Sequence, residues 1–269
     1  MSSTVSIAFP WYDSVWLTSF ARATALLRDY HPGRLEEFVR AFDILRTDPD
    51  FEPKLIQDLF SAEDHDRLRA LIADSGPQRE KHEVLRFGRL VVHDADLCSS
   101  LQAKVTDRMS EWVNEPVEPS YNFLSLYNNF GICGMHLDSP SAKWTLDYCI
   151  EQSAPWPIHL GRVRPWPEEW SRDCSDWEAA VRGDSENRFK SVELEERQAV
   201  VFSGSSQWHY RDRIERRSAN NFCHLLFFHF VPKGSRRLAD PEFWAEDFAI
   251  PELREVIAKP RQHDVSVIA

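Results

Sequence analysis

The sequence has little of what marks secreted, membrane-spanning or zinc-binding proteins. Its five cysteines are odd in number and widely spaced, and no two form a C-x-x-C pair. Neither a disulfide framework nor a zinc ribbon is therefore predicted. No stretch approaches the roughly 20 apolar residues that span a bilayer, and the first residues lack the basic start and apolar run of a signal peptide. We expect a cytoplasmic protein with no membrane partner.

Positive charge is also scarce. The chain has 32 Lys and Arg against 43 Asp and Glu, a net charge of −11. Nucleic acids and anionic membranes favour a basic surface, so neither is expected as a partner. The 269 residues, 42% of them hydrophobic, suffice for one large domain or one domain with extensions.

The first part of the chain has the periodicity of helices. Apolar residues recur at helical spacing over 13–46, and Pro32-Gly33 interrupts the run, which predicts two helices. Residues 1–50 are expected to form a helical extension that packs on the core.

A capped helix is predicted next, over 61–72. Ser61 is a good N-cap, and Asp64 stands at the capping-box position. The remaining segments of this part are expected to be extended at 53–60 and 84–92 and helical at 97–112.

The middle of the chain consists of β-type runs, which suggests a core over 51–235 and a C-terminal extension over 236–269. Helices followed by many short strands are typical of an α+β fold with a barrel or jelly-roll core. A polar, Trp-rich insertion near 161–190 is either a lid or a packed decoration. Strands are expected at 121–127, 144–150, 158–163, 198–202 and 222–231.

The clearest chemical signal is the spacing His136-x-Asp138. In a strand, residues two apart share a face, so the imidazole and the carboxylate point the same way. Gly131 and Gly134 suit a turn that brings this strand close to a cavity. With a distant histidine, the pair would form a 2-His-1-carboxylate metal site with open coordination positions.

His209 is the candidate for the third ligand. It follows a strand-like run at 199–202 and a Ser203-Gly204 turn, and Arg211 lies two residues on at the same parity.

The order of these features resembles the prolyl-4-hydroxylase-like branch of the 2-oxoglutarate- and iron(II)-dependent dioxygenases. The resemblance covers about residues 52–232. It rests on the capped helix, the pattern Y-x-x-x-G-x-x-x-x-H-x-D at 127–138, His209 and the last strand at 226–231. It implies a double-stranded β-helix (a jelly-roll, cupin-like core) and Fe(2+) bound by His136, Asp138 and His209.

The resemblance also implies 2-oxoglutarate as cosubstrate and O2 as oxidant, with succinate and CO2 released. The substrate would be an amino-acid-like, peptidyl or natural-product molecule with an unactivated C–H bond. Related halogenases replace the carboxylate ligand with a small residue, so Asp138 favours hydroxylation or desaturation over halogenation.

The residue that holds the far carboxylate of 2-oxoglutarate is less clear. The family usually places an Arg or Lys on the last core strand, but residues 222–231 contain neither. Arg211 is preferred because it shares parity with His209. The other candidates for cosubstrate binding are Tyr127, His224 and Arg216, and the alternatives are Lys143, Arg86, Arg89 and Arg213.

Two other functions stay open. One is a cupin-like metalloenzyme that does not use 2-oxoglutarate, which the missing cation on the last strand supports. The other is a non-catalytic β-helix binding protein.

Overall fold

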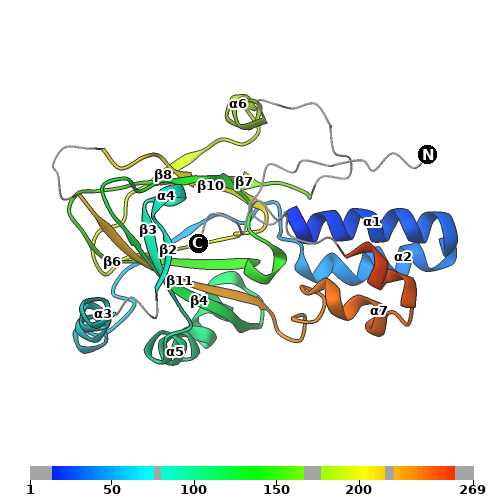
Figure 1. Ribbon diagram of the computed structural model, residues 1–269, viewed down its shortest axis with the longest axis horizontal. Coiled ribbons are helices and arrows are strands. Elements are labelled where there is room, and N and C mark those ends of the chain that lie inside the picture. The colour runs from blue at the N-terminus through cyan, green and yellow to red at the C-terminus, as the bar shows by residue number, and fades with distance from the viewer. Residues whose placement is uncertain (1–13, 76–79, 167–176, 216–220, 258–269) are drawn as a thin grey trace.

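A computed structural model describes residues 14–75, 80–166, 177–215 and 221–257. Two antiparallel sheets face each other and form the centre of the molecule (Figure 1). The larger sheet contains, in spatial order, β1 (Lys54–Ile56), β9 (Ala199–Phe202), β6 (Trp144–Gln152), β11 (Cys223–Pro232), β4 (Val117–Tyr127), β3 (Arg89–His93) and β2 (Glu80–Glu83). The smaller sheet contains β5 (Cys133–His136), β10 (Gln207–Arg211), β7 (Ile158–Val163) and β8 (Lys190–Val192).

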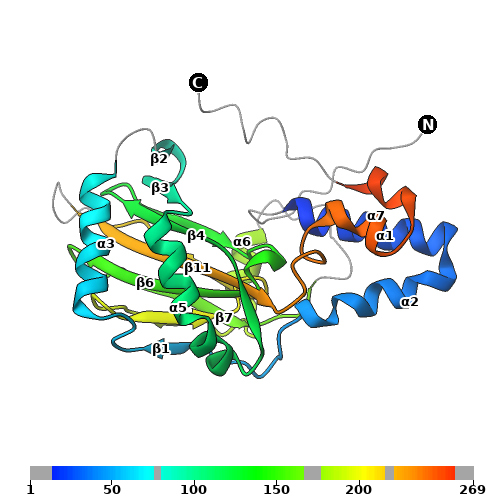
Figure 2. The same cartoon turned by 90° about the horizontal axis from the view of Figure 1, so that it is seen from below.

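Two helices cover the outer face of the larger sheet. These are α3 (Ala62–Asp74) and α5 (Asp96–Val113), which lie across the strands in Figure 2. Alternate residues of β11, such as Leu226 and Phe228, are fully buried in the core on this face. The residues between them point the other way, toward the smaller sheet, because side chains alternate along a strand. The expected α+β class is confirmed, and the predicted strands and helices lie within a few residues of the observed ones.

A helical lobe packs beside the sheets. It comprises α1 (Ser14–Tyr30), α2 (Pro32–Ala41), η1 (Phe42–Leu45), η3 (Pro241–Phe243), α7 (Trp244–Asp247) and η4 (Pro251–Val256). Its aromatic core, with Trp16 and Trp244, continues into Met135 of β5 and Leu137 just after that strand. The outer neighbours of the H-x-D motif are therefore buried against this lobe.

The segment predicted to be extended over 84–92 differs from that expectation. It begins with a short helix, α4 (Val84–Phe87), which Gly88 ends before β3 starts. Gly88 has a φ of +65°, and a Cβ there would lie 2.4 Å from the backbone of Phe130. A glycine is needed because the conformation is left-handed and the space is filled. The expected strand over 53–60 is likewise reduced to β1.

Part of the Trp-rich insertion is visible. Residues 161–163 belong to β7, and α6 (Trp177–Gly183) precedes β8, while 167–176 lie outside the described residues. Trp166 is buried against Trp16, with ring centroids 5.0 Å apart. This end of the insertion packs on the helical lobe, and a lid over the site stays a prediction.

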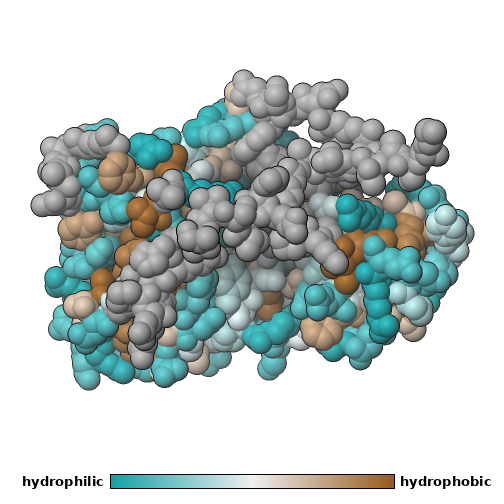
Figure 3. Space-filling model, viewed as in Figure 1, coloured by the Kyte–Doolittle hydropathy of each residue, from teal (hydrophilic) through white to brown (hydrophobic). Residues whose placement is uncertain are grey.

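The described surface is mostly hydrophilic in the view of Figure 3. Within the described ranges, no helix combines the length and the apolarity that crossing a membrane requires.

Candidate metal centre

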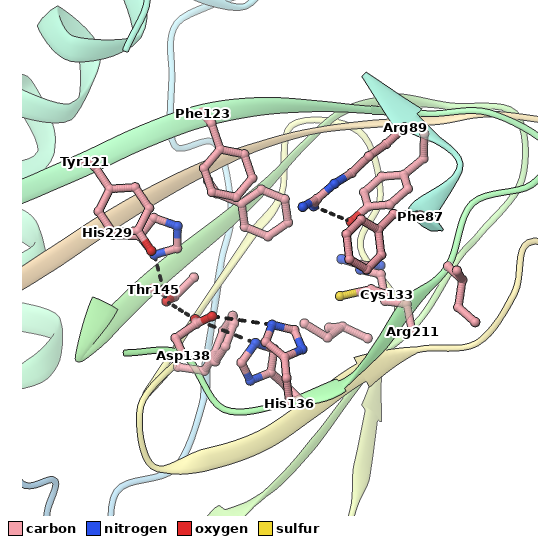
Figure 4. Close-up of a pocket in the computed structure, with 16 residues that line it drawn as sticks. Phe87, Arg89, Tyr121, Phe123, Cys133, His136, Asp138, Thr145, Arg211 and His229 are labelled. Carbon is pink, nitrogen blue, oxygen red and sulfur yellow. Dashed lines mark hydrogen bonds and ion pairs between the residues drawn. The ribbon is translucent and has the colours of Figure 1, made fainter. Parts of the chain in front are cut away.

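The structure brings His136, Asp138 and His209 together. His136 ends β5, Asp138 follows two residues later, and His209 lies in the neighbouring strand β10, directly opposite His136. One potential ligand atom from each side chain lies within 4.8 Å of the other two (Figure 4). The motif and the distant histidine, 71 positions after Asp138 in the sequence, thus meet across one pair of strands.

Backbone carbonyls orient both imidazoles. Nδ1 of His136 lies 2.7 Å from the carbonyl oxygen of Gly134, and Nδ1 of His209 lies 2.9 Å from that of Gln207. A carbonyl only accepts hydrogen bonds, so each Nδ1 carries the proton and each Nε2 presents a lone pair. The Nε2 atoms face Asp138, at 3.4 Å for His136 and 3.7 Å for His209.

Burial favours the protonation states that a metal needs. Burial lowers the pKa of His209 to about 3, so its imidazole is neutral near pH 7. Burial alone would raise the pKa of Asp138, but His209 is protonated in the acidic range where this carboxyl titrates, and its positive charge outweighs burial and holds the pKa below its ordinary value. Two imidazoles and one carboxylate are the donor set of a divalent metal site.

A close backbone approach fixes Asp138. Its amide donates to the carbonyl of Gly204 over 2.8 Å. A Cβ on Gly204 would stand 2.4 Å from Asp138 Oδ2 and 2.6 Å from Thr145 Oγ1, so only glycine fits there. Thr145 donates to Asp138 Oδ2 over 3.4 Å and lies 3.1 Å from Nδ1 of His229.

The three residues line a cavity of about 180 Å³ between the sheets. In Figure 4, Tyr121 and His229 lie on one side of Asp138, and Arg89 and Arg211 lie on the other. The strand β4 explains this separation, because Tyr121 and Tyr127 are six residues apart on one face, about 20 Å along the strand. The cavity therefore has an aromatic end and an arginine end.

At the aromatic end, Asp138 is the charged side chain that the described lining places beside Tyr121, Phe227 and His229, and Phe123 borders the arginine end, with the Arg89 guanidinium 5.7 Å from its ring centroid. His229 stacks on Tyr121 with ring centroids 4.2 Å apart, and Phe123 and Phe227 stack beside them. Burial lowers the pKa of His229 to about 4, so this imidazole is neutral at pH 7.

The arginine end contains two guanidinium groups, of which that of Arg211 is buried and that of Arg89 is partly buried. Arg211 of β10 forms an ion pair with Asp147 of β6 at 2.6 Å and donates to the carbonyl of Trp156. Arg89 of β3 donates to the hydroxyl groups of Tyr127, over 2.9 Å, and Ser125, over 3.3 Å.

The other residues singled out in the sequence lie elsewhere or outside the described ranges. His224 points away from the cavity and pairs with Glu151 at 2.9 Å. Lys143 is buried against Glu115, 2.8 Å away, and does not line the cavity. Arg216 lies outside the described residues. Arg86 and Arg213 also do not line the cavity.

The sequence reasoning missed the contact between Gly204 and Asp138 and the aromatic end of the cavity. The contact joins two loops far apart in the chain, so no local pattern reports it. The aromatic end did leave a signal, because Tyr121, Phe123 and Tyr127 recur at even spacing in one predicted strand.

Comparisons with known proteins find no matching family model and no matching curated protein. Several solved structures have a similar fold. HygX from Streptomyces hygroscopicus, solved with nickel, 2-oxoglutarate and hygromycin B bound, has a TM-score of 0.53 at 11% identity, over 74% of this chain and 87% of that one. AviO1 from Streptomyces viridochromogenes Tue57 has a TM-score of 0.51 at 14% identity, over 73% and 95%.

A third similar structure is SnoN from nogalamycin biosynthesis, a non-haem α-ketoglutarate-dependent epimerase. Its TM-score is 0.51 at 13% identity, over 78% of this chain and 90% of that one. The resemblance stated from the sequence is thus confirmed at the level of the fold: this chain has the fold of proteins that bind or depend on 2-oxoglutarate.

Proposed function

We propose that this chain is a non-haem iron(II)- and 2-oxoglutarate-dependent dioxygenase whose metal ligands are His136, Asp138 and His209. The observation that carries the proposal is the convergence of two oriented Nε2 atoms and one carboxylate in a buried cavity. The two facing sheets would form a double-stranded β-helix, with residues 51–235 as the catalytic core and the flanking segments as extensions.

The donor set fits iron(II) because it leaves one side of the metal open, and nitrogen with carboxylate ligands suits this ion. With 2-oxoglutarate and O2, bound iron(II) supplies an oxidant for a C–H bond, and succinate and CO2 are released. The protein's part is to orient His136, to hold His209 neutral, to keep Asp138 ionised, and to exclude water from the cavity.

The substrate would present an uncharged carbon group to the aromatic end. Tyr121, Phe123 and Phe227 offer apolar rings there, and the neutral His229 adds no charge. HygX was solved with a small molecule, hygromycin B, bound. This supports a small-molecule substrate, although a peptidyl side chain would fit the same chemistry. The retained Asp138 favours hydroxylation over halogenation.

The test is spectroscopic. Iron(II) and 2-oxoglutarate are added to the protein without oxygen, and a weak visible absorption band is expected only when both are present. His136→Ala should abolish the band, because it removes one Nε2 ligand. His31→Ala is the matched control, since His31 lies at the start of α2 in the helical lobe, and it should leave the band unchanged.

A cupin-like metalloenzyme that does not use 2-oxoglutarate is the second candidate. The observation in its favour is that Arg211, on a strand beside the metal, is already paired with Asp147. Tight metal binding without the band would support this candidate. Failure to bind any divalent metal would instead favour a non-catalytic binding protein.

Release of succinate across a panel of compounds would identify the substrate. Neutral compounds should stimulate release more than analogues that carry a charge at the same position. Equal stimulation by both sets would contradict the assignment of the aromatic end.

A further inference from the structure

The arginine end of the cavity has two candidates for binding an anion, and their surroundings differ. Arg211 and Asp147 are 2% and 0% exposed as side chains, and Nη2 of the one lies 2.6 Å from Oδ2 of the other. The other oxygen of Asp147 is buried and has no hydrogen-bond partner among the described residues. An anion that approached Arg211 would therefore meet a buried, under-hydrogen-bonded carboxylate beside it.

Arg89 presents a different face to the cavity. Its Nε and Nη2 atoms bind Glu83 on the side away from the cavity, each at 2.8 Å. Its Nη1 atom donates to two hydroxyl oxygens, those of Tyr127 and Ser125. The atoms beside Nη1 are thus neutral and can themselves donate hydrogen bonds.

A count of hydrogens shows what this group lacks. The two hydrogens of Nη1 are taken up by Ser125 and Tyr127, and each hydroxyl brings one hydrogen of its own. If one hydroxyl donates to the other, one O–H hydrogen is left without an acceptor among the described residues. Burial raises the pKa of Tyr127, so its phenol keeps its proton. A carboxylate oxygen would accept that hydrogen.

The fold holds this group in place. Arg89 and Tyr127 are direct partners in the pairing of β3 with β4. The ring of Tyr127 packs on Trp156 at 4.7 Å between centroids, and Gly88 ends the preceding helix directly before Arg89. Arg89 and Tyr127 line the same cavity as the metal ligands, and Arg89 lies across the cavity from His136 in Figure 4. Ser125 is fully buried and supports Arg89 from outside the cavity lining.

We propose that Arg89 and Tyr127, with Ser125 holding the guanidinium in place, bind the far carboxylate of a 2-oxo dicarboxylic acid whose keto-acid end faces the metal ligands. This deepens the proposed function and rests on it. The anion-binding group then lies on β3, next to β4, and not on the last strand, where the sequence has no cation. Arg211, the preferred residue from the sequence, becomes a structural partner of Asp147.

The experiment compares two ligands that differ only at the far end. 2-Oxoglutarate carries the carboxylate, and 2-oxopentanoate has a methyl group in its place. Their dissociation constants are measured without oxygen by titrating the visible band of the iron(II) protein. For the unaltered protein, 2-oxoglutarate should bind more tightly by about 10- to 100-fold, the usual effect of hydrogen bonds to a charged group.

Arg89→Gln should remove most of that preference by weakening 2-oxoglutarate binding alone. Retained binding of 2-oxopentanoate shows that the variant is folded and holds the metal. Arg89→Lys keeps the positive charge but loses the planar guanidinium with its several N–H donors, and Tyr127→Phe removes only the hydroxyl. Both should therefore lower the preference for 2-oxoglutarate by less than Arg89→Gln does. If Arg89→Gln does not fold, the preference measured for these two milder variants tests whether Arg89 and Tyr127 bind the far carboxylate. Arg67→Gln, in an exposed ion pair of α3, is the charge-matched control.

Three results would overturn the assignment. The first is an unchanged preference in all the Arg89 and Tyr127 variants. The second is loss of the preference in Arg211→Lys with the Arg89 variants unaffected. The third is equal weakening of both ligands in Tyr127→Phe and Arg89→Lys. By contrast, absence of the band in the unaltered protein would contradict the proposed function itself.

Discussion

The buried pair of Arg211 and Asp147 makes a strong prediction about stability. Asp147→Asn keeps the shape of the side chain but removes the charge that compensates Arg211. Both side chains are almost fully buried and their atoms are 2.6 Å apart, so the guanidinium would be left as an uncompensated charge. Breaking such a pair costs about 3–5 kcal/mol of the free energy of unfolding, which corresponds to roughly 5–10 °C in Tm for a chain of this length.

The assay is urea unfolding followed by circular dichroism, on the metal-free protein, for a double-mutant cycle. Arg211→Met alone should also lower the free energy of unfolding, because it leaves the buried carboxylate of Asp147 without its partner. The double variant Asp147→Asn, Arg211→Met should be less destabilised than the sum of the two, because no charge remains. Glu52→Gln is the control, because the ion pair of Glu52 with Lys190 is similarly short, at 2.8 Å, but lies at the surface. This substitution should cost less than about 1 kcal/mol.

A loss below about 1 kcal/mol for Asp147→Asn, with additive effects in the double variant, would refute the reasoning. It would mean that water reaches the pair, or that the side chain of Arg211 points into the cavity and does not pair with Asp147. The second case would return Arg211 to the position of anion-binding residue.

Three further predictions concern the site and its support. Gly204→Ala should weaken binding of iron(II) by at least about 10-fold with little change in circular dichroism, because a Cβ would stand 2.4 Å from Asp138 Oδ2; isothermal titration measures it, and unchanged affinity would contradict the contact. The metal-free protein should lose stability as the pH falls below about 6.5. The pKa values of His209 and His229 are lowered to about 3 and about 4 in the folded state, so the unfolded state binds more protons there. Each group should contribute about 1.4 kcal/mol per pH unit down to its folded pKa, and a flat profile of urea midpoints between pH 4 and 6.5 would be inconsistent with this. Ser61→Ala should cost about 1 kcal/mol by removing the cap that accepts from Asp64 over 3.1 Å, and an unchanged Tm would speak against it.

Local pattern was sufficient for most of the elements. The two helices on either side of Pro32, the Ser61 cap and the long strands all follow from spacing between neighbours in the chain. The extended segment expected at 84–92 was partly wrong because its first half forms α4. Gly88 has a reason to be glycine only once Phe130 lies against it, and that contact spans about 40 residues.

The grouping of the candidate metal ligands was predictable for a related reason. The spacing of His136 and Asp138 fixes their common face without knowledge of the rest of the fold, and parity after a strand selects His209. Their meeting requires only that β5 and β10 pair. Because His136 ends β5 with Asp138 two residues later, and His209 lies within β10, two local patterns were enough to locate all three side chains.

Even spacing along a strand does not identify the residues that bind the cosubstrate, because it gives the face on which a side chain lies and not the partner that it contacts. Arg211 does share a face with His209 and lines the cavity, as its spacing indicates. Its charge, however, is compensated by Asp147, a residue 64 positions away on a strand of the other sheet. Arg89 is 47 positions before His136, and nothing in its own segment points to the metal. It reaches the cavity because β3 pairs with β4, residue for residue, at Tyr127. Arg89 is also paired, with Glu83, but its Nη1 atom contacts neutral hydroxyl groups, and such a difference between two paired arginines can be seen only once the sheet register is known.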